Sequence, residues 1–136
     1  AMSPEEQTQL ALEAHEMLLG GLPRKSLTHL IENLVVIRRM APLEKAVGMS
    51  LRTIQRRNKD APDKPLSQEQ SGRAWKFAEI LAKAMKVFGS REEAEQWLER
   101  PAIGLDRRRP IDLLATPAGV EMVEEYLHQL EYGVYV

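Results

Sequence analysis

The stretch from Pro42 to Lys59, PLEKAVGMSLRTIQRRNK, constrains the fold of this chain more than any other. A short apolar segment is followed by Gly48 and then by a segment of polar and basic side chains. Leu51 and Ile54 are three residues apart, so they share one helical face and can pack against the apolar residues before the turn. The pattern predicts two short helices joined by a tight turn, which is a helix-turn-helix.

The second of these helices, from about Ser50 to Lys59, is predicted to bind DNA through the face opposite Ile54. Arginine can pair with guanine, glutamine with adenine, and lysine with phosphates, while a threonine methyl group can touch thymine. The predicted DNA-binding residues are Ser50, Arg52, Thr53, Gln55, Arg56, Arg57 and Lys59. The alternative is a solvated basic helix in an ordinary helical bundle, because basic helices are common.

Positive charge is concentrated around this motif, although the net charge of the whole chain is only −1. Residues 24–59 hold nine lysines and arginines against two glutamates, which gives a local net charge of +7. The residues before Arg24 and those from Pro110 onward carry acidic side chains and no lysine or arginine. A polyanion is therefore expected to bind the centre of the chain and not its ends.

Apolar residues recur with helical spacing along nearly the whole chain, which predicts an all-α fold. Residues that favour helix starts are Ser3, Ser26, Ser50, Ser67, Ser90 and Thr116. In the long helix that starts at Ser67, the predicted buried stripe is Trp75, Ala78, Leu81, Ala82 and Met85, with Phe88 as a further candidate. A proline-rich loop from Asp60 to Pro65 predicts a boundary between an N-terminal region, residues 1–62, and a C-terminal region, residues 63–136.

The composition excludes several classes of protein. With 43% hydrophobic and 29% charged residues the chain is globular, and the absence of cysteine excludes disulfides and fits a reducing cytosol. No apolar run approaches the roughly 20 residues that span a bilayer. The first residues are acidic and polar, unlike a secretory signal. We therefore expect a cytoplasmic protein without a membrane partner.

Side chains for catalysis or metal binding are few. His15, His29 and His128 lie far apart, and without cysteine a zinc site needs all three together. There is no glycine-rich phosphate loop, and the glutamates between Glu92 and Glu99 resemble a solvated helix face more than an acid–base pair. We expect no catalytic residues, no metal and no cofactor, and hence a protein that is not an enzyme.

Two further segments are unusual. The last residues, Tyr126 to Val136, are apolar and hold three tyrosines, whereas chain ends are normally polar. Tyrosine is enriched at interfaces, so the tail either binds a partner or folds back onto its own core. The triplet Arg107-Arg108-Arg109 is either a second phosphate clamp or a solvated loop with ion pairs, and Asp106 beside it weakens the first interpretation.

An ordered set of residues in the second half carries a family resemblance. The set is Phe88-Gly89-Ser90, Glu93-Ala94, Trp97-Leu98, Pro101, Pro110 to Thr116, Gly119, Val123, Leu127 and Tyr132 to Tyr135. It resembles the antitoxins of the Xre/MbcA/ParS type, which are partners of RES-domain toxins in bacterial type II toxin–antitoxin pairs. Many members have Gly-Gly after the leucine that matches Leu105, where this chain has Asp106-Arg107.

The resemblance implies a protein in two parts. Its N-terminal region forms a homodimer and binds the operator DNA of its own promoter as a repressor. Its C-terminal region binds the toxin and blocks the pocket, within a larger toxin–antitoxin assembly. RES toxins degrade NAD, so inhibition protects the cell's NAD. The expected toxin-binding residues are Tyr126, Gln129, Leu130, Tyr132, Gly133, Val134, Tyr135 and Val136.

Two other functions compete with this one. A stand-alone transcription regulator has a C-terminal half that senses a small ligand, and a buried pocket with convergent polar groups favours it. A purely structural dimerisation module carries the basic helix only incidentally. A steep fall of DNA affinity with salt, together with preference for one DNA sequence, excludes that module.

Overall fold

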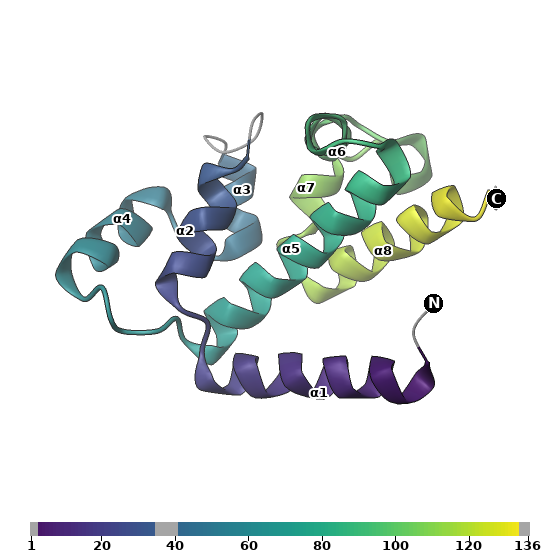
Figure 1. Cartoon of the computed structure of the whole chain (residues 1–136). Coiled ribbons are helices and arrows are strands. Elements are labelled where there is room, and N and C mark those ends of the chain that lie inside the picture. Colours follow the sequence, from purple (N-terminus) through teal and green to yellow (C-terminus); the bar gives the residue numbers. More distant parts are fainter. Residues whose placement is uncertain (1–2, 35–40, 134–136) are drawn as a thin grey trace.

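The computed structural model describes residues 3–34 and 41–133, and within these residues the fold is all-α, as predicted. The elements are α1 (Pro4–Gly20), α2 (Arg24–Glu32), α3 (Ala41–Val47), α4 (Leu51–Asp60), α5 (Gln68–Phe88), α6 (Arg91–Glu99), the 3-10 helix η1 (Ile103–Leu105), α7 (Pro110–Leu113) and α8 (Pro117–Glu131). Figure 1 shows α5 as a long central helix between α2–α4 and α6–α8. No helix in the described ranges has the length and hydropathy needed to cross a bilayer.

Most helices begin at the capping residue that the sequence predicts. Ser3, Ser50, Ser67, Ser90 and Thr116 each accept a hydrogen bond from the backbone N–H three residues later. The prediction for Ser26 is wrong, because α2 begins two residues earlier, directly after Pro23. Pro23 has extended backbone angles and precedes the first helical residue, so the helix starts there without a side-chain cap.

The buried face of α5 differs from the predicted stripe. The buried residues are Ser71, Ala74, Phe77, Ile80, Leu81 and Ala84. Of the predicted stripe only Leu81 is fully buried, while Trp75 is half-buried and Ala82 is exposed. The reason is that α5 packs against α1, α3, α6 and α8 together, and no single stripe serves all four partners. Even Ser71 is buried, because its hydroxyl accepts a hydrogen bond from the backbone N–H of Leu22 at 2.8 Å.

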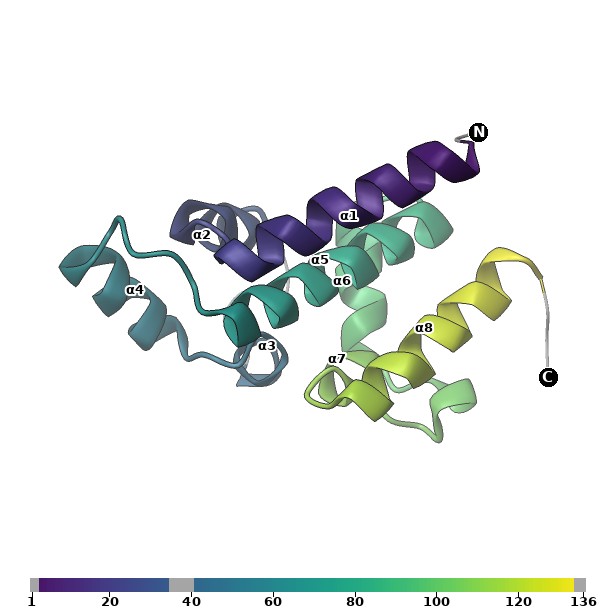
Figure 2. The same ribbon diagram turned by 90° about the horizontal axis from the view of Figure 1, so that it is seen from below.

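The helix α1 contributes little to the core. It has no buried residue, and Leu10, Leu12, Met17 and Leu19 are each about half exposed. Figure 2 shows α1 running beside α5, and Figure 1 shows the two helices diverging toward the N-terminus. The end of α1 is held more firmly, because the backbone N–H of Leu66 donates to the carbonyl of Leu22 at 2.9 Å.

The closest approach in the C-terminal half is between α7 and the first turn of α8. Gly119 is buried there, and a Cβ atom added to it would lie 1.9 Å from the carbonyl oxygen of Leu113. That oxygen belongs to the backbone and cannot move aside as a flexible side chain can. The crossing of α7 and α8 therefore depends on a residue without a side chain.

Replacing this glycine is expected to destabilise the fold. The change Gly119→Ala should lower the free energy of unfolding by about 3 kcal/mol, because the added methyl group forces α7 and α8 apart. The matched control is Gly72→Ala in α5, where nothing lies within 4 Å of an added Cβ atom. That change should stabilise by about 0.5–1 kcal/mol, since alanine is the better helix former. Urea unfolding of both variants measures the difference, and equal stabilities would contradict the account.

Candidate DNA-binding and partner-binding sites

The helix-turn-helix has the predicted geometry. Gly48 between α3 and α4 has a φ of 79°, a conformation that glycine adopts without strain. Leu43, Val47 and Ile54 are buried in the hydrophobic core. Glu44 strengthens the turn, because its Oε2 accepts a hydrogen bond from the backbone N–H of Leu51 at 2.6 Å. This role of Glu44 was missed by the sequence analysis, which treated the residue only as a charge.

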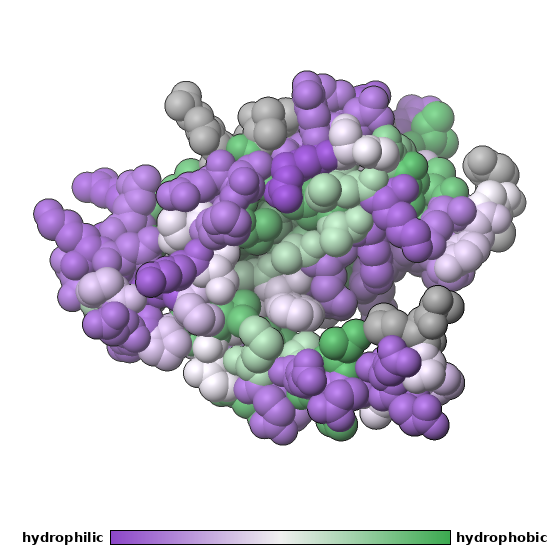
Figure 3. All heavy atoms as spheres, in the orientation of Figure 1, coloured by the Kyte–Doolittle hydropathy of each residue, from purple (hydrophilic) through white to green (hydrophobic). Residues whose placement is uncertain are grey.

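The predicted DNA-binding residues lie on α4 and at its cap, and most of their side chains are exposed. The side chains of Arg52, Gln55, Arg56, Arg57 and Lys59 are exposed, and none bonds to another residue in the described part of the chain. Thr53 is half-buried, and its Oγ1 accepts a hydrogen bond from the hydroxyl of Ser50 at 2.8 Å. Figure 3 shows hydrophilic side chains gathered over α4, at the end of the molecule away from the C-terminus. Their contact with DNA stays a prediction.

Two contacts fix α4 and α3 on the rest of the molecule. The side-chain amide of Asn58 donates from Nδ2 to Oγ1 of Thr28 at 2.8 Å, which joins α4 to α2. Arg73 of α5 donates from Nη2 to the backbone carbonyl of Lys45 and, at 3.4 Å, to that of Ala115. Arg73 therefore joins α3 to the connection between α7 and α8. No spacing in the sequence indicates this contact, because both acceptors are backbone atoms from distant segments.

The aromatic residues of the C-terminal half form a stack, and Tyr126 is part of it. Its ring lies 6.1 Å from that of Trp97, which lies 5.2 Å from that of Phe88. On its other side Tyr126 touches Gly104, where an added Cβ atom would lie 2.4 Å from the ring. Tyr126 is half-buried, so its position fits a residue that supports the surface as well as one that binds a partner.

The other expected toxin-binding residues lie at the end of α8. Tyr132 is 64% exposed, and its ring lies 4.6 Å from that of His128. Gln129 and Leu130 are half-buried, and Gly133 is exposed. The remaining three, Val134, Tyr135 and Val136, lie outside the described residues.

The connection between η1 and α7 contains two residues in the left-handed conformation that glycine adopts without strain. Asp106 and Arg107 both have positive φ, 55° and 61°. For residues with side chains this left-handed conformation costs about 1–2 kcal/mol each. Arg109 forms a two-pronged ion pair with Asp112 at 2.9 and 3.0 Å, while Arg107 and Arg108 are exposed. One of the three arginines is thus paired, with a carboxylate of α7.

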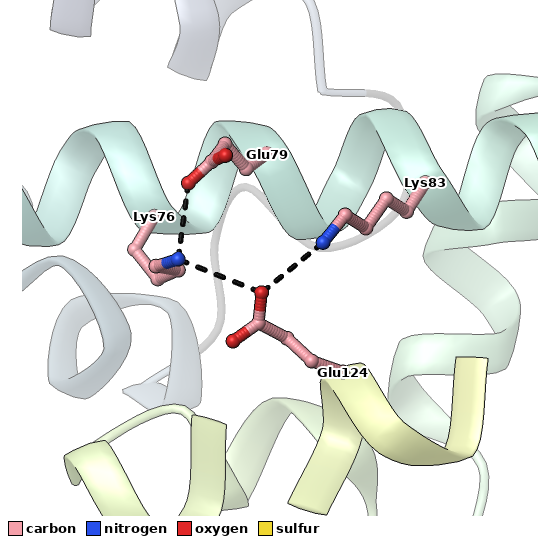
Figure 4. A network of polar contacts seen from close by, with 4 residues as sticks. All are labelled: Lys76, Glu79, Lys83 and Glu124. Atoms are coloured by element: carbon pink, nitrogen blue, oxygen red, sulfur yellow. Dashed lines mark hydrogen bonds and ion pairs between the residues drawn. The ribbon is translucent and has the colours of Figure 1, made fainter. Parts of the chain in front are cut away.

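Ion pairs hold α8 against α5 (Figure 4). Oε2 of Glu124 lies 3.5 Å from Nζ of Lys76 and 3.1 Å from Nζ of Lys83. Lys76 is also 3.1 Å from Glu79. Partial burial lowers the pKa of Lys76, but the hydrogen bonds and charges of Glu79 and Glu124 outweigh it, so this pKa is raised above its ordinary value.

A groove of about 890 Å³ lies between α5 and the start of α8. Its lining includes Arg73, Lys76, Phe77, Val120 and Glu124, so part of its charge is already paired across the groove. In the described ranges no three histidine, aspartate or glutamate side chains converge into a possible metal site.

The chain matches two family models, one for each half. Residues 13–79 match the Antitoxin Xre-like helix-turn-helix domain. Residues 83–133 match the Antitoxin Xre/MbcA/ParS C-terminal toxin-binding domain. The first match includes α3 and α4, and the second includes the aromatic stack and α8.

Curated proteins are similar to the chain over different lengths. Antitoxin Xre of Pseudomonas putida strain KT2440 is 32% identical over 121 residues, which cover 89% of this chain and 72% of that protein. Antitoxin Xre of Photorhabdus laumondii is 30% identical over 67 residues, or 48% of this chain and 45% of that protein. A 6-hydroxy-3-succinoylpyridine 3-monooxygenase of Pseudomonas putida strain S16 is 44% identical over 50 residues, but these cover only 16% of the enzyme and assign no activity.

The stability contributed by the ion pairs of Glu124 is expected to decrease at high salt and at alkaline pH. Glu124→Gln should lower the free energy of unfolding by about 1 kcal/mol at low salt and by less at high salt. Because the pKa of Lys76 is raised on folding, this stabilisation is complete below the ordinary lysine pKa of 10.5 and disappears as the pH rises through the raised value. Thermal unfolding at several pH values and salt concentrations measures both effects.

The control for this variant is Glu125→Gln on the next residue of α8. Glu125 is exposed and forms no ion pair with any residue in the described ranges. The Glu125→Gln variant should have the same free energy of unfolding as the unchanged chain at every salt concentration. If both variants lose the same stability, net charge and not the ion pairs explains the effect.

Proposed function

The chain belongs to the family of Xre antitoxins, and we propose that it neutralises a RES-domain toxin by blocking the toxin's pocket and represses its own operon through the helix-turn-helix. The observation that carries the proposal is that one chain combines an exposed basic helix, α4, with a region that matches a toxin-binding domain. The chain then acts by binding and has no catalytic role. Since its expected target degrades NAD, the biological result is protection of NAD.

The DNA-binding part of the proposal rests on α4 and on a homodimer. Two copies would present two recognition helices to half-sites one helical turn apart, about 34 Å. The helix α1 supports dimerisation, because it carries apolar residues on two sides. Leu18 packs on the core of its own chain, whereas Leu12 and Leu19 lie about 100–120° away around the helix and are 51% and 50% exposed. Exposed apolar side chains that line one side of a helix favour coverage by a partner.

The toxin-binding part rests on the end of α8. Tyr132 is the most exposed of the described aromatic residues, and a large exposed apolar side chain at a chain end is best explained by a partner that covers it. We assign DNA binding and dimerisation to residues 1–62 and toxin binding to residues 63–136. Contacts from α5 to α1 and α3 on one side and to α6 and α8 on the other link the two regions.

The groove between α5 and α8 favours a second candidate function, a regulator that senses a small ligand. Its volume of about 890 Å³ suits a small molecule. Its charged residues are partly paired with one another, so it presents few free polar groups to a ligand. Operator binding that changes on addition of a metabolite, in the absence of any toxin, would favour this candidate.

Removing two arginines from α4 is expected to weaken operator binding without affecting the toxin. Arg52→Ala with Arg56→Ala should lower the affinity for operator DNA at least about 100-fold, because each arginine contact to a base contributes about 1–3 kcal/mol. The slope of log affinity against log salt should also become shallower. Fluorescence anisotropy with labelled operator DNA measures the affinity, and toxin binding should stay unchanged.

A pair of arginines at the start of α6 and directly after its end serves as the control. Arg91→Ala with Arg100→Ala removes the same charge at the other end of the molecule. This double variant should bind the operator nearly as well as the unchanged chain. If both pairs weaken binding equally, the total charge of the protein and not the face of α4 governs affinity.

Deleting residues 132–136 is expected to abolish neutralisation and spare the fold. Tyr132 and Gly133 are exposed, so their removal exposes no core residue. The truncated chain should retain its thermal stability and its operator binding, but cells that express it with the toxin should no longer grow. If the truncated chain still protects the cells, the blocking element lies elsewhere in the protein.

A further inference from the structure

Ile103 is an exposed apolar residue at the tip of a rigid turn. It is 88% exposed, although Ala102 before it and Leu105 after it are buried at 8% and 2%. The turn is closed by backbone hydrogen bonds, including those from Arg107 N to Ala102 O at 2.8 Å and from Ala102 N to Arg108 O at 3.1 Å. Ile103 is therefore held outward by its neighbours. A rigid apolar tip loses little conformational freedom when a partner binds it.

Asp106 and Arg107 in this turn have left-handed backbone conformations, which are unusual for residues with side chains. Glycine at positions 106 and 107 would give the same backbone without strain, yet the chain carries Asp106 and Arg107 there. The side chain of Arg107 is exposed and bonds to no residue in the described ranges. No contact of this side chain within these ranges therefore offsets the strain of its backbone. A contact between Arg107 and a binding partner explains why an arginine stands at this strained position.

Two unpaired cations border the apolar tip. The side chains of Arg107 and Arg108 are exposed and form no ion pair within the described ranges, whereas Arg109 is paired with Asp112. Arginine beside an exposed apolar residue is a common composition of protein interfaces. We define Ile103, Arg107 and Arg108 as the tip surface.

The position of the tip surface indicates its partner. It lies within residues 83–133, the toxin-binding domain, and Gly104 packs directly on Tyr126 of α8. In Figures 1 and 2 the connection between α6 and α7 lies on the same side as the end of α8, and α4 lies at the other end of the molecule. DNA held by α4 is therefore at the opposite end, while a protein bound at the end of α8 is adjacent.

We infer that the tip surface is a second contact for the toxin, separate from the tail; this inference rests on the proposed function. The face of the toxin that meets it has an apolar hollow for Ile103, bordered by carboxylates that pair with Arg107 and Arg108. The tail then blocks the pocket, and the tip surface supplies affinity and selects the correct toxin. Tyr126 acts as a positioning residue, because it supports the turn at Gly104.

The test uses the full chain and the RES-domain protein encoded in the same operon, with affinity measured by isothermal titration calorimetry. Ile103→Asp should weaken binding by roughly 30-fold or more, as for a central interface residue, and leave the melting temperature unchanged. Arg107→Gly should weaken binding by roughly tenfold and make it less sensitive to salt. It should also raise the melting temperature, since glycine relieves the strain.

The matched control for the arginine is Asp106→Gly. It relieves the same kind of backbone strain, so the melting temperature should rise, but it removes a side chain that has no part in the contact. Its toxin affinity should equal or exceed that of the unchanged chain. Opposite effects of Arg107→Gly on stability and on binding cannot arise from simple damage to the fold.

The outcomes separate this inference from the proposed function. If the unchanged chain binds the toxin and the chain without residues 132–136 does not, while Ile103→Asp binds normally, the inference is wrong and the proposed function stands. If the unchanged chain does not bind the toxin, both are wrong. Loss of self-association by Ile103→Asp, or loss of operator binding by Arg107→Gly, with normal toxin affinity would assign the surface to a second copy or to DNA and overturn the inference.

Discussion

The contact of Arg73 with two backbone carbonyls connects the two halves of this molecule. One guanidinium reaches the carbonyl of Lys45 at the end of α3 and that of Ala115 just before α8. It also lies against Gly48, where an added Cβ atom would be 2.7 Å from its Nη1. The turn of the helix-turn-helix and the base of α8 are thus held by the same side chain. Any rotation of α8 that moves Ala115 therefore acts on the turn that orients α4.

The two proposed binding surfaces, on α4 and at the end of α8, have opposite physical characters and lie apart. The α4 end presents exposed cations that bond to nothing in the described ranges, which suits a polyanion. At the end of α8 the ring of exposed Tyr132 lies against that of His128, and an exposed tyrosine suits a protein partner. The acidic residues of α8 are in part used internally, since Glu124 and Glu131 pair with lysines of α5. This pairing keeps the negative charge of Glu124 and Glu131 near α5 and away from the basic face of α4.

The sequence predicts what local signals determine and misses what distant contacts determine. The all-α fold, the turn at Gly48 and the caps at Ser50, Ser67 and Thr116 follow from residues a few positions apart, and the structure confirms them. The buried face of α5 was predicted wrongly, because four other helices decide which of its residues are covered. The contacts of Arg73 and the support of Gly104 by Tyr126 join distant segments, so no periodicity reveals them.

The position of α5 has a consequence for how such proteins can be recombined. The two family matches meet between residues 79 and 83, in the middle of α5. A gene fusion at that point would join two half-helices whose buried residues, Phe77 and Ala84 among them, had fitted different neighbours. The loop between α4 and α5 allows a junction that leaves every helix whole. A toxin-binding half exchanged there would carry α5 and Arg73 with it, and it would have to fit the α3 of its new host.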